Sequence, residues 1–135
     1  MTILSRDQIL NADDLKRDKV LVPEWGDDES YLFVRTMTGA ERDAFELSLL
    51  KQGKGKKQEV NRENFRARLV AATAVDESGD PIFQAADVAE LGKKSSLALQ
   101  RVFNVSARLN GFTDADIEEL AKNSEAAPGE SSPSD

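Results

Sequence analysis

The sequence predicts a single α+β domain, mostly helical, in which an N-terminal β-hairpin packs on about four to five helices. Two β-branched apolar runs lie close together near the N-terminus, and longer segments with helical spacing of apolar residues follow them. A chain of 135 residues with 39% apolar content is long enough for one core but hardly for two. We expect an arm with a short helix over residues 1–17, the domain over 18–122 and a disordered acidic tail over 123–135.

A short helix is expected in the N-terminal arm. Ser5 lies three residues before Gln8, and this spacing is typical of a capping box, in which each side chain bonds the other residue's backbone N–H. The sequence therefore predicts a helix from about Arg6 to Ala12.

Two apolar runs predict the hairpin. The first run, KVLVPEWG, is stopped by Pro23, and the second is SYLFVRTM. The GDD segment between them has the composition of a turn, so we expect the two strands to pair. The period of two residues places alternate side chains of the second strand on opposite faces, namely Tyr31, Phe33 and Arg35 on one and Leu32, Val34 and Thr36 on the other.

A helix should follow the hairpin directly. Thr38 and Glu41 form a second capping box at its start, and we expect the helix to end near Gln52. Its apolar positions form a wide stripe that should face the core: Ala44, Phe45, Leu47, Leu49 and Leu50.

A lysine-rich segment and a third helix come next. GKGKK, with two glycines and three lysines, is expected to be a flexible exposed connection. In NRENFRARLVAATAV the helix should open at Asn61, and Phe65, Leu69 and Ala72 recur at helical spacing. We expect an amphipathic helix with one apolar face.

The second half of the domain should contain a turn and two more helices. VDESGDPIF predicts a turn at Gly79, with Val75 and Ile82–Phe83 paired across it. A short helix should span about Ala85 to Leu91. The segment SSLALQRVFNVSARLNG predicts a longer helix that ends before Gly111 and has one apolar face: Leu99, Val102, Phe103, Ser106 and Leu109.

The negative charge is concentrated at the C-terminal end. Residues 113–135 contain seven acidic residues and one lysine, which gives −6 of the net −7, so the first 112 residues sum to −1. The final SEAAPGESSPSD contains too few apolar side chains to offset the entropy of ordering, and we expect it to be disordered. The overall acidity argues against binding to nucleic acid, which needs a basic face.

The composition excludes most catalytic sites. The chain has no Cys and no His, which removes disulfides, thiol nucleophiles, Ser-His-Asp triads and nearly all transition-metal sites. The acidic cluster Glu24, Asp27, Asp28 and Glu29 offers oxygen ligands for a hard cation, but consecutive carboxylates point in different directions, so a solvated turn is the better interpretation. We therefore expect a non-enzymatic protein with no cofactor and no metal.

The sequence gives no sign of a membrane or secretory protein. No apolar run approaches the length of a membrane span, and MTILSRDQIL lacks the basic and apolar regions of a signal peptide, so we expect a cytoplasmic protein.

The lysines between residues 51 and 57 lack the spacing of a phosphate-binding loop. A solvated loop is the favoured interpretation, and an acidic protein surface is an alternative partner for it.

Trp25, next to Gly26, is the one large aromatic residue that strand alternation does not assign to the core. A place in the core or at its rim is the simpler interpretation. Exposed on the hairpin, it would anchor a protein partner, because Trp buries a large area at low entropic cost. The candidate protein-binding residues are apolar and aromatic positions of the hairpin and the next helix: Trp25, Tyr31, Phe33, Phe45 and Leu49.

Several short motifs follow one another between Val20 and Gly111. They are VPEWG, TG followed by ER, RARL leading to DESGD and a phenylalanine, DVAELG, and LNG. Each motif is weak alone, but their order and spacing resemble the tail assembly chaperones of long-tailed bacteriophages and prophages of the lambda-like and siphophage type. One position departs from the family pattern, since Gln84 stands where Thr or Ser usually caps a helix.

The resemblance implies a small, non-catalytic α+β protein that works in the host cytoplasm. Proteins of this family bind the long, aggregation-prone tape measure protein, help to recruit subunits of the major tail tube protein and are absent from the mature virion. A self-oligomer is a further partner that we expect.

The resemblance also implies a second gene product. Many genes of this family yield a longer form through programmed ribosomal frameshifting near the 3′ end. Ala121, Lys122 and Asn123 can be encoded by a slippery A-AAA-AAC sequence and lie where the folded domain is expected to end. We therefore hypothesise that the ribosome shifts frame at Ala121 to Asn123 and produces a longer form whose sequence differs from there on.

Two other functions are compatible with the sequence. A head-tail connector or minor tail protein would share the size and the phage context, but it would form stable rings and be present in particles. An acidic adaptor or nucleic-acid regulator would act through the loop from Lys51 to Lys57.

Overall fold

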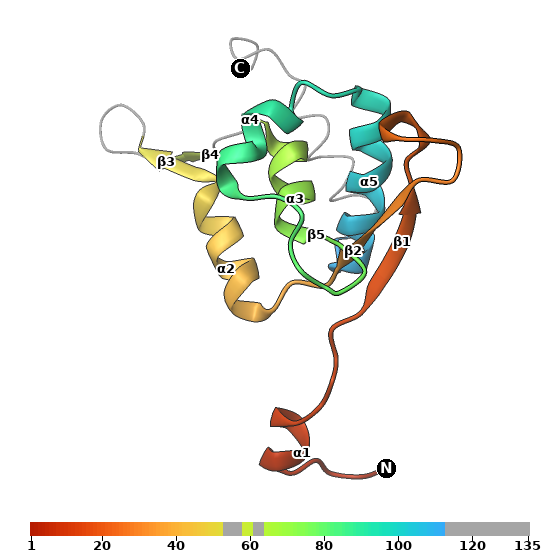
Figure 1. Cartoon of the computed structure of the whole chain (residues 1–135). Coiled ribbons are helices and arrows are strands. Elements are labelled where there is room, and N and C mark those ends of the chain that lie inside the picture. The colour runs from red at the N-terminus through yellow and green to blue at the C-terminus, as the bar shows by residue number, and fades with distance from the viewer. Residues whose placement is uncertain (53–57, 61–63, 113–135) are drawn as a thin grey trace.

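The computed structural model describes residues 1–52, 58–60 and 64–112 and shows an α+β domain. A three-stranded antiparallel sheet in the order β1-β2-β5 packs on α3 and α5, while α2 and α4 flank α3 (Figure 1). The predicted fold class is therefore confirmed. The elements are α1 (Arg6–Leu10), β1 (Arg17–Leu21), η1 (Pro23–Trp25), β2 (Tyr31–Arg35), α2 (Gly39–Ser48), β3 (Leu50–Gln52), β4 (Gln58–Val60), α3 (Phe65–Thr73), β5 (Ala74–Val75), η3 (Ala85–Asp87), α4 (Val88–Leu91) and α5 (Ser96–Leu109).

The hairpin has the predicted faces. Strands β1 and β2 pair antiparallel, with Leu21 opposite Tyr31, and Val34 lies fully buried on the inner face. Phe33 lies on the outer face, where the Arg17 guanidinium is 4.2 Å from its ring centroid. The connection is longer than a single turn at GDD. The pairing of the two strands continues beyond Leu21 through the bond from the Val22 N–H to the Ser30 carbonyl. The 3-10 turn η1 follows in the connection.

The predicted pairing across the Gly79 turn is present in a reduced form. Val75 and Pro81 form a single bridge, and the N–H of Ile82 donates to the carbonyl of Ala74 at 3.1 Å. Gly79 has a φ of +89°, as the turn requires. The main partner of β5 is β2, which the local sequence pattern did not predict because that pairing spans a long stretch of chain.

Helix α2 begins as predicted and ends earlier. Both bonds of the Thr38–Glu41 capping box are present. The predicted end near Gln52 is wrong, since the helix stops at Ser48 and residues 50–52 pair with β4. The Ser48 hydroxyl donates to the Phe45 carbonyl at 2.6 Å, a side-chain bond that competes with continued helix. The wide apolar stripe is also wrong, because Phe45 is buried while Leu47 is 68% exposed.

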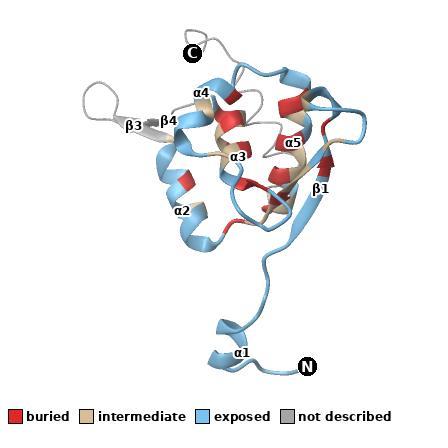
Figure 2. Ribbon diagram, in the orientation of Figure 1, coloured by how far each residue is buried: buried red, intermediate tan, exposed pale blue. Residues whose placement is uncertain are grey.

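Helix α3 lies at the centre of the domain. The predicted opening at Asn61 lies outside the described residues, and α3 begins at Phe65 after Asn64, which has a φ of +52°. The prediction of an amphipathic helix is wrong, because Ala72 of the predicted apolar face is exposed while Ala67, on the opposite side of the helix, is buried. The buried residues are red in Figure 2. They are Phe65, Ala67, Leu69, Val70 and Thr73.

Helix α5 packs along α3 with the predicted face, and Ser106 places its hydroxyl 2.8 Å from that of the buried Thr73. Gly111 has the positive φ, +87°, expected after the helix. The predicted helix over 85–91 is divided into η3 and α4. Gln84 is the weak cap expected from the sequence. The Asp87 carboxylate accepts a hydrogen bond from the Gln84 N–H at 2.8 Å and so satisfies this backbone donor at the start of η3.

Asn110 fastens the end of α5 to the link between β2 and α2. Its Oδ1 accepts from the N–H of Met37 at 2.7 Å, and its Nδ2 donates to the carbonyls of Ser106 and Arg35 at 2.9 and 3.2 Å. The Arg42 guanidinium donates to the Asn110 carbonyl at 2.9 Å. One buried amide therefore satisfies backbone groups of two segments far apart in the sequence.

Asn110→Ala should lower the free energy of unfolding by about 2 kcal/mol, because the buried N–H of Met37 loses its acceptor. Urea unfolding would measure the loss. Asn104→Ala on the same helix is the matched control, with an expected change below about 1 kcal/mol, because within the described residues the Asn104 side chain accepts one hydrogen bond, from Gln100 one turn earlier. Equal losses in the two variants would contradict this role of Asn110.

Glu41 gives the stability a dependence on acid pH. Hydrogen bonds from the Arg35 guanidinium, at 2.7 and 2.8 Å, lower the pKa of Glu41 from 4.5 to about 2. A carboxyl whose pKa is lower in the folded state stabilises the fold above its ordinary pKa, and this contribution disappears as the pH falls toward 2. Glu41→Gln should therefore flatten the decline in stability between pH 4.5 and pH 2.

The effect should stay below about 1 kcal/mol, because the Glu41 side chain is 44% exposed. Gln at this position can retain the capping box, which isolates the charge. In the Arg35→Gln background the same substitution should leave the pH dependence unchanged. An unchanged acid profile for Glu41→Gln alone, followed by circular dichroism during urea unfolding, would refute the assignment.

Candidate binding groove

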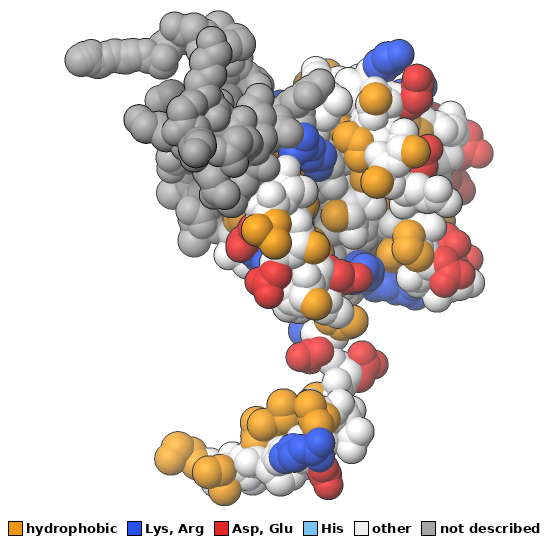
Figure 3. All heavy atoms as spheres, turned by 90° about the vertical axis from the view of Figure 1, so that its left-hand side faces the viewer, with side chains coloured by type: hydrophobic (Ala, Val, Ile, Leu, Met, Phe, Trp, Pro, Cys, Tyr) orange, Lys and Arg blue, Asp and Glu red, His pale blue; other side chains and the backbone are white. Residues whose placement is uncertain are grey.

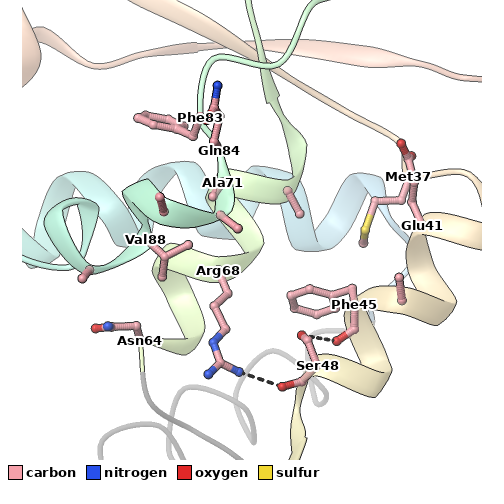
Figure 4. Close-up of a pocket in the computed structure, with 15 residues that line it drawn as sticks. Met37, Glu41, Phe45, Ser48, Asn64, Arg68, Ala71, Phe83, Gln84 and Val88 are labelled. Carbon is pink, nitrogen blue, oxygen red and sulfur yellow. Dashed lines mark hydrogen bonds between the residues drawn. The ribbon is translucent and has the colours of Figure 1, made fainter.

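An open groove of about 740 Å³ lies between α2 on one side and η3 and α4 on the other. Helix α3 forms its floor. In Figure 4, Met37 and Phe45 approach the groove from the α2 side and Val88 from the α4 side. The lining residues are Met37, Glu41, Ala44, Phe45, Ser48, Asn64, Arg68, Ala71, Ala72, Phe83, Gln84, Ala85, Ala86, Val88 and Ala89.

Alanine dominates the lining. Six of the lining residues are alanines, contributed by α2, α3, η3 and α4. Small side chains leave the helix backbones close to the surface, so another helix could approach closely and bury apolar area. Figure 3 shows this side of the molecule, with hydrophobic side chains on both banks and a hollow between them. The groove is suited to an apolar helical segment rather than to a small polar ligand.

The charged residues of the groove lining already have partners. Glu41 pairs with Arg35, and the Arg68 guanidinium donates to the Ser48 carbonyl at 3.0 Å, as Figure 4 shows. The charge-assisted bonds from Arg35 lower the pKa of Glu41 to about 2, so the Glu41–Arg35 pair stays charged well into acid pH. The lining therefore has no net charge and no constellation of groups suited to acid-base chemistry.

A close approach holds the α4 side of the groove in place. A Cβ atom at Gly92 would lie 2.5 Å from the Asn64 side-chain oxygen, so any larger residue would displace the Asn64 side chain where α4 ends beside the start of α3. Leu91, just before it, is buried in the core. The short α4 helix is thus positioned by packing rather than by its own length.

The structure divides the five predicted binding residues among different places. Phe45 is buried and forms part of the groove wall, and Leu49 is half-buried against the core. Tyr31 and Phe33 lie on the outer face of the sheet, with their rings edge to face at 5.6 Å. Lys19 lies 4.5 Å from the Tyr31 ring centroid, and the Tyr31 hydroxyl donates to Glu77, whose carboxylate raises the pKa of Tyr31.

Trp25 lies at the rim of the core. It is half-buried against the core cluster, and its buried Nε1 has no hydrogen-bond partner among the described residues. It borders a second open hollow of about 630 Å³ together with Phe83, Leu91 and Lys94. Glu24, one residue earlier, receives two bonds of 2.7 Å from Arg101, which lower the pKa of Glu24 to about 2.

The acidic turn and the lysine-rich segment have different outcomes. Asp27 accepts from the N–H of Glu29 and from the Ser30 hydroxyl, both at 3.0 Å, and these bonds lower the pKa of Asp27. Asp27 therefore shapes the turn, and the described ranges 1–52, 58–60 and 64–112 contain no group of three or more acidic side chains placed to hold a metal. The predicted GKGKK loop and the acidic tail lie outside those ranges.

Reasoning from the sequence did not show that the groove alanines form one surface. Four of the six lie in AATA at 71–74 and QAAD at 84–87, far apart in the sequence from Ala44 of α2. Clusters of small residues in helices are a usable signal for close helix approach, but their positions on a common surface depend on the packing of three segments.

Among the helices of the described residues, none is long and apolar enough to cross a membrane.

Comparison with known proteins gives a likeness in structure. No family model matches the chain, and no curated protein matches it significantly in sequence. The structure of the bacteriophage HK97 tail assembly chaperone matches over 76% of this chain and 94% of that chain, with a TM-score of 0.51 and 15% sequence identity. The chain therefore has the fold of the HK97 tail assembly chaperone, in agreement with the resemblance that its motifs show.

Proposed function

We propose that this protein is a non-catalytic tail assembly chaperone of a long-tailed bacteriophage or prophage. In this function it binds the tape measure protein in the host cytoplasm and helps to recruit subunits of the major tail tube protein. The observation that carries the proposal is the likeness in fold to the HK97 chaperone across nearly that whole chain. The motif order from Val20 to Gly111 supports it independently, because it is a property of the sequence alone.

The groove between α2 and α4 is the surface proposed to hold the tape measure protein. Its lining is apolar, shallow and electrically neutral, which suits the apolar face of an amphipathic helix. A long client with many such segments would bind many copies of the chaperone. Each contact would be weak enough to be released when the tail tube replaces the chaperone, while avidity keeps the whole client covered.

The charge distribution fits a protein that coats an aggregation-prone client. Residues 113–135 carry −6 of the net −7, whereas the first 112 residues are nearly neutral. Negative segments on every bound copy would repel one another and keep the coated client soluble. The proposed frameshift position, Ala121 to Asn123, lies in this same part of the chain, outside the described residues.

Ala72→Glu should reduce recovery of the tape measure protein with the chaperone at least about tenfold, because a carboxylate without a partner would be buried at the contact. Ala72 is exposed on the groove floor, so the substitution leaves the core intact. Ala89→Glu on the opposite bank should act in the same way. Co-expression of the two proteins followed by affinity purification and quantitative mass spectrometry measures the recovery.

Leu97→Glu is the matched control. Leu97 is 74% exposed on α5 and does not line the groove, so recovery should equal that of the wild type. Thermal unfolding should confirm that all three variants are folded. Unchanged recovery with both groove variants would exclude this groove as the client site, whereas loss with the control as well would point to an effect of added charge in general.

A further inference from the structure

The N-terminal arm, residues 1–16, presents apolar side chains that no described residue covers. Helix α1 has no buried residue, and Figure 1 shows the arm projecting away from the domain. In Figure 3 hydrophobic side chains gather along one side of the arm and at its tip. The exposed large apolar residues of the arm are Met1, Ile3, Leu4, Ile9, Leu10 and Leu15, with Ile3 at 93% exposure and Leu10 at 64%.

The arm contains a helix prepared for contact but too short to be stable alone. Both capping-box bonds are present, from Ser5 N–H to Gln8 at 2.9 Å and from Gln8 N–H to Ser5 at 3.2 Å. Leu4 and Ile9 hold the positions of a hydrophobic staple around this cap. A helix of five residues is nevertheless marginal in water, so a packing surface is needed to hold it. The clustered apolar side chains identify the arm as a docking segment.

The groove between α2 and α4 matches the arm in chemistry. Its lining is apolar, and its two charged residues, Glu41 and Arg68, are already bonded within the domain. Helix α1 likewise carries one charge of each sign, and Arg6 and Asp7 pair with each other at 3.1 Å. A neutral apolar helix and a neutral alanine-lined groove can join without leaving a buried charge unpaired.

The root of the arm favours a groove on another molecule. The carbonyl of Lys16 accepts from the N–H of Thr36 at 2.8 Å, which fastens the arm to the sheet. The connection of residues 11–15 contains no glycine and spans at most about 17 Å when extended. To reach the groove of its own domain, the chain would have to reverse within this short segment, whereas the groove of a neighbour can be reached in the observed outward direction.

We propose that the N-terminal arm of one copy docks in the groove of a second copy. The contact is heterologous, because the two copies contribute different surfaces, and repetition would produce a ring or an open chain of subunits. It uses the groove assigned above to the tape measure protein, so an arm would leave as a client segment enters. Self-association itself requires no client, which makes its test independent of the proposed function.

Sedimentation velocity of the full chain over a range of concentrations tests the proposal. The wild type should self-associate, and the paired arm substitution Ile9→Asp with Leu10→Asp should lower the apparent association constant at least about tenfold. Ala72→Glu in the groove should have the same effect. Leu97→Asp, an exposed apolar residue outside both surfaces, should associate like the wild type.

Mixing the variants separates this contact from any other interface. The arm variant keeps an intact groove and the groove variant keeps an intact arm, so an equimolar mixture should form a one-to-one heterodimer at a concentration at which each variant alone is a monomer. A monomeric wild type, an arm variant that still associates, or a mixture that stays monomeric would each overturn the proposal. Normal client recovery by the arm variant would show that the function proposed for the groove stands regardless of this outcome.

Discussion

Helix α3 lies between the sheet, α5 and α4, and the rest of the domain is arranged by the need to cover it. The Phe65 ring at its start lies 5.9 Å from the ring of Phe45 and 5.8 Å from that of Phe103, so a single aromatic side chain joins α2, α3 and α5. Leu69 and Val70 are fully buried in the following turn. Burial of this kind supplies most of the favourable free energy of a small domain.

The groove is a consequence of this arrangement. The sheet and α5 cover two sides of α3, and α4 covers part of a third. Between α4 and α2 the surface of α3 is left open, and Ala71 and Ala72 lie there. Their small side chains form an apolar floor without a large apolar protrusion, which suits a surface proposed to bind an apolar segment.

Local signals in the sequence predicted the parts of the fold that depend on near neighbours. The alternation around Val34, the capping boxes at Ser5 and Thr38, and the positive φ after α5 were all predictable, because each involves residues a few positions apart. The central position of α3 was not predictable, because helical periodicity cannot show how many neighbours will pack around a helix. The early end of α2 was not predicted either, because residues 50–52 pair with β4, and helical periodicity does not reveal that pairing. Of the candidate site, Phe45 was identified, whereas the meeting of six alanines on one surface became visible only when the segments were assembled.

The proposed chaperone function requires a protein that binds its client and later leaves it, and the neutral groove and the arm proposed to dock there suit that cycle. Quantitative mass spectrometry of infected-cell lysates and of purified phage particles tests this central claim most directly. The chaperone should co-purify with the tape measure protein from lysates and be missing from finished particles. Recovery of the chain from purified particles in fixed proportion to the tail tube protein would contradict the account and indicate a structural component of the virion.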